Sequence, residues 1–240
     1  MKYFVNCIKE YPNLKTDIKQ LIPEMNVRRR MSKLLKMGVC TALESLIDFE
    51  QTSEIDAIIT ASSLGAIADS ERFFTTLNPV AFIQSTPNTI GGQIALIRNK
   101  KCYNNTFVHR NNSFESALLE AMLRLKLGSS KAVLLGIFDE ATLVTEKVLQ
   151  RLNILKDKTL GEGAIFFVLT SEQVECSVAE IELEFDTEYP NTVLVSQENN
   201  TYWSGAVAEL LTSTIEQRKD VTISNDLNTT MRSVIKIKSL

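Results

Sequence analysis

The sequence predicts an α/β fold in which layers of helix alternate with layers of sheet. Apolar runs of strand length alternate along the chain with helical segments, and that order is typical of a layered α/β unit. One helical segment, residues 114–127, is apolar on nearly every face, which indicates a helix buried between layers. Because no linker-like or low-complexity stretch interrupts the order, we expect one domain over residues 1–240.

The first hundred residues predict a helix, a strand, a second helix, a loop and a third helix. Apolar residues at helical spacing predict an amphipathic helix over residues 30–48. "EIDAIITASS" predicts a short buried strand, and "SERFFTTL" predicts a helix capped by Ser70. "NPVAFIQSTPN" indicates a proline-bounded loop. "TIGGQIALIRN" predicts a helix in which Gly91 and Gly92 permit close backbone packing.

The middle of the chain predicts a strand, a sharp corner and the apolar helix. "CYNNTFVHR" has the β-branched and aromatic content of a strand, and Asn112 with Glu115 resembles a capping box. Gly128 ends the helix. "KAVLLGIF" predicts a central strand, "EATLVTEKVLQRL" a surface helix and "LGEGAIFFVLT" another strand, with Glu162 expected in a buried contact between two glycines.

The last part of the chain predicts four strands and one helix. The strands are "VAEIELEF", "TVLVSQ", "VTISN" and "MRSVIKIK", with a turn at Tyr189-Pro190 and a helix in "GAVAELLTSTIEQR". In the last strand Arg232, Lys236 and Lys238 alternate with Met231, Ile235 and Ile237, so one face should be outward and charged.

The composition excludes several classes of function. The 240 residues are 44% hydrophobic with a net charge of −3, and the basic residues are dispersed, so we expect neither a nucleic acid nor a membrane as partner. The four cysteines are far apart, which favours a reducing cytoplasm, buried free thiols and no metal site. The first residues lack a secretory pattern, and no apolar run is long enough to cross a membrane. We therefore expect a cytoplasmic protein without a cofactor.

Several motifs in this order resemble the β-ketoacyl synthases of the thiolase-like fold. "RRMSKLLKMGVCTALESL" is similar to the first family helix, and "SSLGAIADSERFFTTLNPVAFIQSTPNTIGGQIAL" to the stretch before the nucleophile strand. "GSSKAVLLGIFDEA" and "LGEGAIFFVL" resemble two later family strands, and "ISNDLNTTMRSVIKIK" more weakly resembles the closing segment. The resemblance is strongest to the ketosynthase-like N-terminal-domain branch and to chain-length factors. It implies a layered α/β/α/β/α fold with an N-terminal half over residues 1–170 and an abbreviated C-terminal half over residues 171–240.

The resemblance also implies that the condensing machinery is missing. It places the family's nucleophilic cysteine at the strand-to-helix corner, on Asn111 or a neighbour, and the nearest cysteine, Cys102, is nine residues away. Active members hold the substrate carbonyl with two histidines, or a histidine and an asparagine, in the C-terminal half. This chain has one histidine, His109, and it offers Tyr202 and Trp203 where the second histidine would be.

Other residues of the corner are candidates for binding or for different chemistry. Ser113 lies near a helix N-terminus, with His109 as a base and Asp139 or Glu140 as its orienter, although a cap and a strand-end hydrogen bond are the simpler roles. Arg110 is either near an anionic carrier or a structural ion-pair partner. By resemblance, an acyl tunnel would be lined or plugged by three aromatic residues, Phe82, Phe107 and Phe114.

These expectations define one leading function and two alternatives. The resemblance implies a non-catalytic subunit like a chain-length factor, paired with an active β-ketoacyl synthase in polyketide, aryl-polyene or fatty-acid-type synthesis and served by acyl carrier protein. The strand "YNNTFVHR" would form the dimer edge, which needs pairing. The alternatives are an acyltransferase or thioesterase that uses Ser113, and a homodimeric acyl-binding module.

Overall fold

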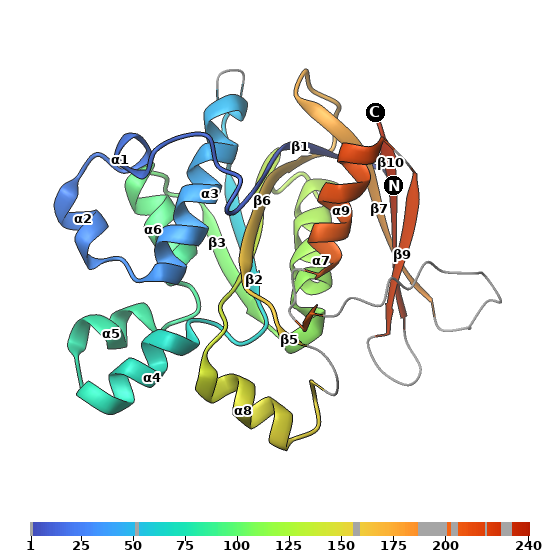
Figure 1. The fold of residues 1–240 in the computed structure, drawn as a ribbon. Coiled ribbons are helices and arrows are strands. Elements are labelled where there is room, and N and C mark those ends of the chain that lie inside the picture. The colour runs from blue at the N-terminus through green and yellow to red at the C-terminus, as the bar shows by residue number, and fades with distance from the viewer. Residues whose placement is uncertain are drawn as a thin grey trace.

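The computed structural model describes residues 2–50, 53–155, 159–186, 201–202, 206–218, 220–226 and 232–240 (Figure 1). Its helices are α1 (Ile18–Leu21), α2 (Met25–Arg30), α3 (Lys33–Phe49), α4 (Ile67–Thr76), α5 (Pro79–Gln84), α6 (Thr89–Ile97), the 3₁₀ turn η1 (Arg110–Asn112), α7 (Ser113–Lys126), α8 (Leu143–Arg151) and α9 (Ala206–Gln217). Its strands are β1 (Tyr3–Glu10), β2 (Ala57–Ser62), β3 (Tyr103–Val108), β4 (Ala132–Asp139), β5 (Thr159–Leu160), β6 (Gly163–Thr170), β7 (Ser177–Asp186), β8 (Thr201–Tyr202), β9 (Val221–Asp226) and β10 (Arg232–Ser239).

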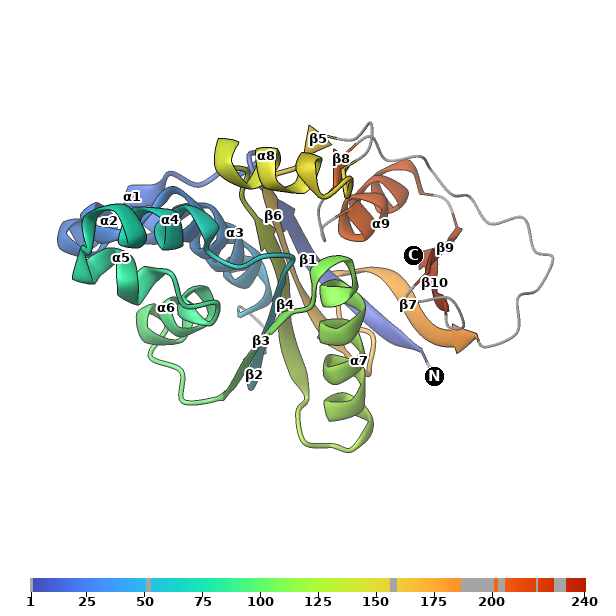
Figure 2. The ribbon, with the colours of Figure 1, turned by 90° about the horizontal axis from the view of Figure 1, so that it is seen from below.

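Eight strands form one mixed sheet in the order β3-β2-β4-β6-β1-β7-β10-β9. β2 pairs in parallel with β3 and β4, whereas β6, β1, β7, β10 and β9 join their neighbours antiparallel. The sheet curves strongly, so that α7 and α9 lie between its two ends, and α3 covers the opposite side of the N-terminal strands (Figures 1 and 2). This arrangement confirms the predicted α/β fold with a central helix layer.

The core consists of two apolar clusters, one on each side of the sheet. In β4, Val133, Leu135 and Ile137 pack toward α7, whereas Leu134 and Phe138 pack toward α3. Every residue of β4 and of β6 is buried, as expected for strands covered on both faces. The sheet therefore separates an α7 side from an α3 side.

Close backbone contact explains two of the glycines. A Cβ on Gly136 would overlap the ring of Phe166, which crosses directly above β4. A Cβ on Gly91 would lie 2.5 Å from Oδ1 of Asn104, so α6 approaches β3 only because this residue is glycine. The prediction of close packing is wrong for Gly92, which faces open space.

Charged pairs cover the outer face of the C-terminal strands. Lys2 Nζ lies 2.8 Å from Glu180 Oε2, and Lys236 Nζ lies 2.7 Å from Glu184 Oε2. Ile235 and Ile237 are buried on the inner face, so the predicted alternation along the last strand is confirmed at these positions. An outward face of paired lysine and glutamate side chains is stable in contact with water.

Several predicted details are wrong. Ser70 lies inside α4 and donates to the Ala66 carbonyl, since the helix begins three residues earlier. The predicted loop at residues 78–88 contains α5, because Asn78 caps a helix that has Pro79 at its first position. Glu162 is exposed and pairs with Lys33 at 2.6 Å.

Four of the sequence-based expectations lie outside the described residues: the strand in "TVLVSQ", the turn at Tyr189-Pro190, Trp203 and Met231. In the described ranges each helix is too short or too polar to cross a lipid bilayer.

Candidate functional site

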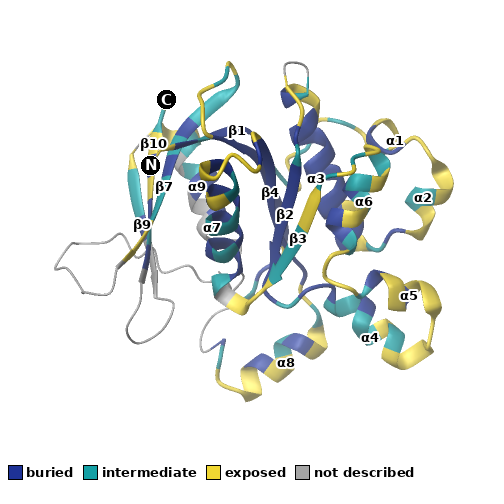
Figure 3. Cartoon of the chain, turned by 180° about the vertical axis from the view of Figure 1, so that it is seen from behind, coloured by how far each residue is buried: buried dark blue, intermediate teal, exposed yellow. Residues whose placement is uncertain are grey.

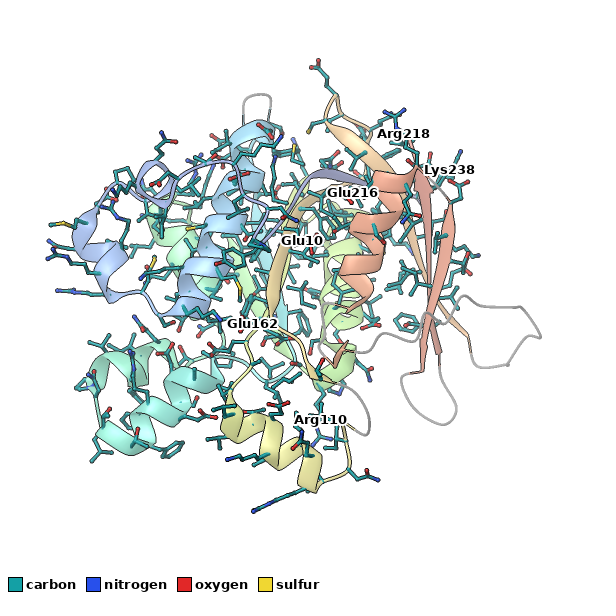
Figure 4. All side chains as sticks on the ribbon, viewed as in Figure 1. Glu10, Arg110, Glu162, Glu216, Arg218 and Lys238 are labelled. Atoms are coloured by element: carbon teal, nitrogen blue, oxygen red, sulfur yellow. The ribbon has the colours of Figure 1, made fainter. Side chains whose placement is uncertain are left out.

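Three parallel strands end at one edge of the sheet and define the candidate site. β2, β3 and β4 end at Ser62, Val108 and Asp139, and their registers bring these ends side by side. The carboxyl ends of parallel strands are where α/β proteins commonly bind ligands. The corner that joins β3 to α7 lies at this edge, and Arg110 is at the same end of the molecule as α8 (Figure 4).

The corner is closed by hydrogen bonds to Ser113. The His109 backbone N–H donates to Ser113 Oγ at 2.8 Å, and the Ser113 hydroxyl donates to the Arg110 carbonyl at 2.7 Å. The Asn112 N–H donates to the His109 carbonyl at 3.2 Å, whereas the Asn112 side chain makes no cap bond, so the predicted capping box does not form. Ser113 thus holds the corner in the structural role that was the simpler reading of the sequence.

The described corner has no exposed nucleophile. Ser113 is fully buried and its hydroxyl is already committed as donor and acceptor. His109 is exposed, and Asn111 contributes its backbone to η1. Arg110 has a φ of +51°, a conformation that side-chain-bearing residues seldom adopt, so the turn remains locally strained.

Two of the four cysteines, Cys102 and Cys40, are poorly suited to act as nucleophiles at the corner. Cys102 precedes β3, and six strand residues, roughly 20 Å of chain, separate it from the corner. Burial raises the pKa of Cys102, and burial raises the pKa of Cys40 to about 11. A thiolate, which is the reactive species, is therefore disfavoured at both positions.

Two acidic residues at the end of β4 form a structural network. Asp139 Oδ1 accepts hydrogen bonds from the Ser62 hydroxyl and the Ser63 N–H at 2.8 and 2.7 Å. Glu140 Oε1 accepts from the Ala68 N–H at 2.9 Å, and burial raises its pKa to about 7. Asp139 holds the end of β2, so it is not available to orient His109.

The three phenylalanines expected at an acyl tunnel lie in different surroundings. Phe114 is buried, with its ring edge-on to Phe167 at a centroid distance of 6.4 Å. Phe107 is half-buried on β3 against the same cluster. Phe82 is 54% exposed on α5, where it contacts Phe73, and Figures 1 and 2 place α5 far from the corner. The structure therefore brings Phe107, Phe114 and the corner together and leaves Phe82 apart.

The free side of β3 and one stripe of α7 form an open surface, here called the edge surface. β3 is the last strand of the sheet, and it is half-exposed to fully exposed along its length (Figure 3). Tyr103 donates to Glu120 at 3.0 Å, and the Arg124 guanidinium lies 3.8 Å above its ring, which places this stripe of α7 beside the strand. Leu123 and Leu127 belong to the same stripe and are 42% and 75% exposed.

This stripe corrects the prediction that α7 is buried on all sides. Leu118, Ala121 and Leu125 are buried as expected, but the positions that face the edge surface are not. The sequence shows that α7 is apolar on nearly every face. Because this fold covers only part of the helix, the apolar residues on the remaining face are exposed, and such a face is typical of a contact surface.

A second apolar surface lies on α4, α5 and α6. Its side chains are more than 40% exposed: Phe74, Leu77, Val80, Phe82, Ile83 and Leu96. Isolated exposed apolar residues are ordinary, but a contiguous group on neighbouring helices indicates a contact surface.

The comparisons with known proteins agree with this geometry. The family model described as "Beta-ketoacyl synthase, N-terminal domain" matches residues 9–145. The comparison with curated proteins found no match.

Solved structures with the same fold are ketosynthases and their complexes. A ketosynthase in complex with its chain length factor from Xenorhabdus doucetiae matches with a TM-score of 0.69 and 14% identity over 98% of this chain and 99% of that chain. The ishigamide ketosynthase/chain length factor matches with a TM-score of 0.72 and 14% identity over 94% and 86% of the two chains. A type II PKS acyl-carrier protein in complex with its ketosynthase bound to the hexaketide matches with a TM-score of 0.71 and 14% identity over 100% and 99%. At this identity the likeness establishes the fold alone.

Proposed function

The chain belongs to the family of β-ketoacyl synthase N-terminal domains, and from this premise we propose that it is a non-catalytic subunit like a chain-length factor. In this proposal it pairs with an active β-ketoacyl synthase in polyketide, aryl-polyene or fatty-acid-type synthesis. The pair would receive its acyl groups from acyl carrier protein. We further propose that residues 1–170 and 171–240 are the two halves of one ketosynthase-like domain.

The corner is the observation that carries the proposal. Carbon–carbon bond formation through a thioester needs an activated nucleophile at the helix N-terminus. At that place this chain has Arg110, Asn111 and Asn112, and the Ser113 hydroxyl is committed to the backbone on both sides. A corner of this kind would preserve the turn from β3 to α7 but would not form the acyl thioester that condensation needs.

The edge surface supports a partner subunit. β3 ends the sheet with unpaired backbone groups on its free side, which would pair with an equivalent strand across a two-fold axis. The exposed side chains of Leu123 and Leu127 would be covered at the same time. This open edge of β3 therefore favours a stable dimer over a monomer.

Phe82 is one of the three phenylalanines, together with Phe107 and Phe114, that we propose line or plug an acyl tunnel, although it lies on α5 apart from the other two. It projects from α5 with its ring 54% exposed, supported from behind by Phe73 at 5.0 Å. A supported, exposed aromatic ring is a suitable wall for a growing acyl chain. Phe107, Phe114 and the corner residues His109, Arg110 and Asn111 would support the interface from this chain's own side.

Two alternatives remain as outcomes of the test. An acyltransferase or thioesterase would use Ser113, which the hydrogen bonds of the corner disfavour. A homodimer that binds acyl groups would use the same edge surface without a synthase.

Co-expression with a candidate ketosynthase from the same gene cluster tests the proposal. Size-exclusion chromatography and native mass spectrometry should show a one-to-one complex, and the synthase should lose condensing activity with acyl carrier protein when this chain is omitted. A stable homodimer that ignores the synthase would refute the pairing.

Mass spectrometry of the corner peptide separates the remaining alternative. After incubation with acyl thioesters, the peptide that contains Ser113 should carry no acyl group. An acyl adduct on Ser113 would instead establish independent transferase or thioesterase chemistry.

A further inference from the structure

A cavity of about 490 Å³ opens beside α3, on the side of the sheet opposite to α7. We call it the α3 cavity. Its walls are the first half of α3 and the segment at residues 11–18. Leu14, Ile18, Met37 and Cys40 form an apolar floor, and the side chains of Lys33 and Lys36 stand at the rim. A volume of this size lies in the usual range of small-molecule sites, roughly 300–1,000 Å³.

The wall opposite α3 is fixed by hydrogen bonds. Glu44, a buried residue one helical turn beyond Cys40 on α3, accepts the backbone N–H groups of Lys15 and Thr16 at 2.9–3.1 Å. At the other end of the segment, the Tyr11 N–H donates to the Ala164 carbonyl at 2.9 Å. Because both ends are tied to the core, the space between them is preformed and does not depend on a ligand.

The rim of the cavity carries positive charge. Lys33 and Lys36 lie in the first turns of α3, where the helix dipole also favours an anion. Lys33 already pairs with Glu162, but both side chains are largely exposed, and such a pair is weak. Lys36 has no ion-pair partner within the described part of the chain, and it is exposed beside the apolar floor.

Two carboxylates near the cavity have structural roles. Glu44 accepts two backbone N–H groups, as described above. Asp17 accepts the Lys19 N–H at 2.7 Å as the cap of α1. Their charges reduce the positive potential near the floor, but in the described part of the chain neither forms an ion pair with Lys36, so Lys36 is the side chain that an incoming anion would pair with.

The cavity is distinct from the corner and from the two phenylalanines that lie beside it. Met37 and Cys40 belong to the α3-side cluster, whereas Phe107 and Phe114 belong to the α7-side cluster. The buried strands β4 and β6 lie between the two sides. A ligand in the α3 cavity would therefore not contact Phe107 or Phe114.

We propose that the α3 cavity binds a small amphipathic carboxylate, with the anionic group paired with Lys36 and the alkyl body against Leu14, Ile18 and Met37. Among the residues that the structure describes, the apolar floor and the unpaired Lys36 at its rim select this class. A purely polar anion would not bury the apolar side chains of the floor, and a neutral alkyl chain would form no ion pair with Lys36. The inference does not depend on the proposed function, because it concerns this chain without a partner.

Calorimetric titration of the full chain with octanoate tests the proposal, with octanol as the neutral probe. Octanoate should bind saturably and more tightly than octanol. Lys36→Glu should weaken octanoate binding at least tenfold, since it replaces attraction with repulsion at the rim. Lys126→Glu, an exposed lysine at the end of α7, changes the net charge equally and should leave binding unchanged.

Three results would overturn the proposal: absence of saturable octanoate binding, equal affinity for octanol, or equal weakening by Lys36→Glu and Lys126→Glu. Should Lys36→Glu fail to fold, Lys36→Gln decides. This variant should bind octanoate more weakly than wild type does, and equal affinities would refute the site.

Discussion

Replacing Glu140 by glutamine tests whether the carboxyl edge of the sheet is a closed, buried network. Glu140 is only 7% exposed at the end of β4, and burial raises its pKa from 4.5 to about 7. The nearby Asp69 carboxylate raises the pKa further, whereas the hydrogen bond from the Ala68 N–H lowers it. Glutamine keeps an oxygen that can accept this N–H but cannot ionise, so Glu140→Gln removes the charge and keeps the geometry.

The direction of the effect follows from proton linkage. Because the folded protein holds the Glu140 proton more tightly than the unfolded chain does, ionisation favours unfolding. Wild-type stability is therefore highest below pH 4.5 with respect to this group, falls as pH rises from 4.5 to about 7, and is not recovered above that. At roughly 1.4 kcal/mol per pH unit, the full loss is about 3 kcal/mol.

Urea unfolding of both proteins between about pH 5 and pH 8 measures this difference. The free energies of unfolding should be similar at the acidic end, and Glu140→Gln should be more stable by up to about 3 kcal/mol at the alkaline end. Glu216→Gln is a suitable control, because Glu216 is exposed on α9, far from this edge (Figure 4). Parallel pH profiles for wild type and Glu140→Gln would refute the assignment of a buried, neutral carboxyl group.

Three other variants test the interface, the tunnel and the α3 wall. Changing Leu123 and Leu127 together to aspartate should weaken binding to the partner synthase about 100-fold in a chromatographic titration, since roughly 2–3 kcal/mol of apolar burial is lost; Leu152→Asp on α8 is the exposed control, and equal losses would contradict the edge surface. Phe82→Ala should lengthen the acyl products measured by mass spectrometry, and an unchanged length would exclude Phe82 from the tunnel. Glu44→Ala should lower the free energy of unfolding by about 3 kcal/mol, because two backbone N–H groups lose a charged acceptor; an unchanged urea midpoint would contradict this anchor.

The sequence predicted the elements whose pattern is local. Buried strands such as β4 are continuous apolar runs, and α7 ends where Gly128 adopts a φ of +68°. The sequence does not predict α5 because proline commonly bounds a loop, although it also suits the first turn of a helix, as Pro79 does here after the cap Asn78. Ser70 was misplaced because α4 begins at a residue without a side-chain cap, so no local signal marks its start.

The features of the site that were missed depend on contacts between distant segments. The α3 cavity exists because Glu44 holds the backbone of residues 15 and 16, a contact between positions 28 and 29 residues apart. No periodicity in either segment indicates that pairing. The raised pKa of Glu140 likewise needs the burial that α4 and the end of β4 create together. By contrast, the residue types at the corner, Arg110, Asn111, Asn112 and Ser113, can be read directly from the sequence, and the proposed loss of the nucleophile depends on them.

The corner and the edge surface are linked through β3 and α7. The Ser113 hydroxyl makes two hydrogen bonds with the backbone of the corner that joins these elements. Arg124 and Glu120 of α7 contact Tyr103 of β3, so the exposed stripe that includes Leu123 and Leu127 lies beside the strand. A partner would therefore recognise a shape that the corner maintains, and changes at Ser113 should act on association through this geometry. Under the proposed function, the corner serves the interface and the reacting groups belong to the partner synthase.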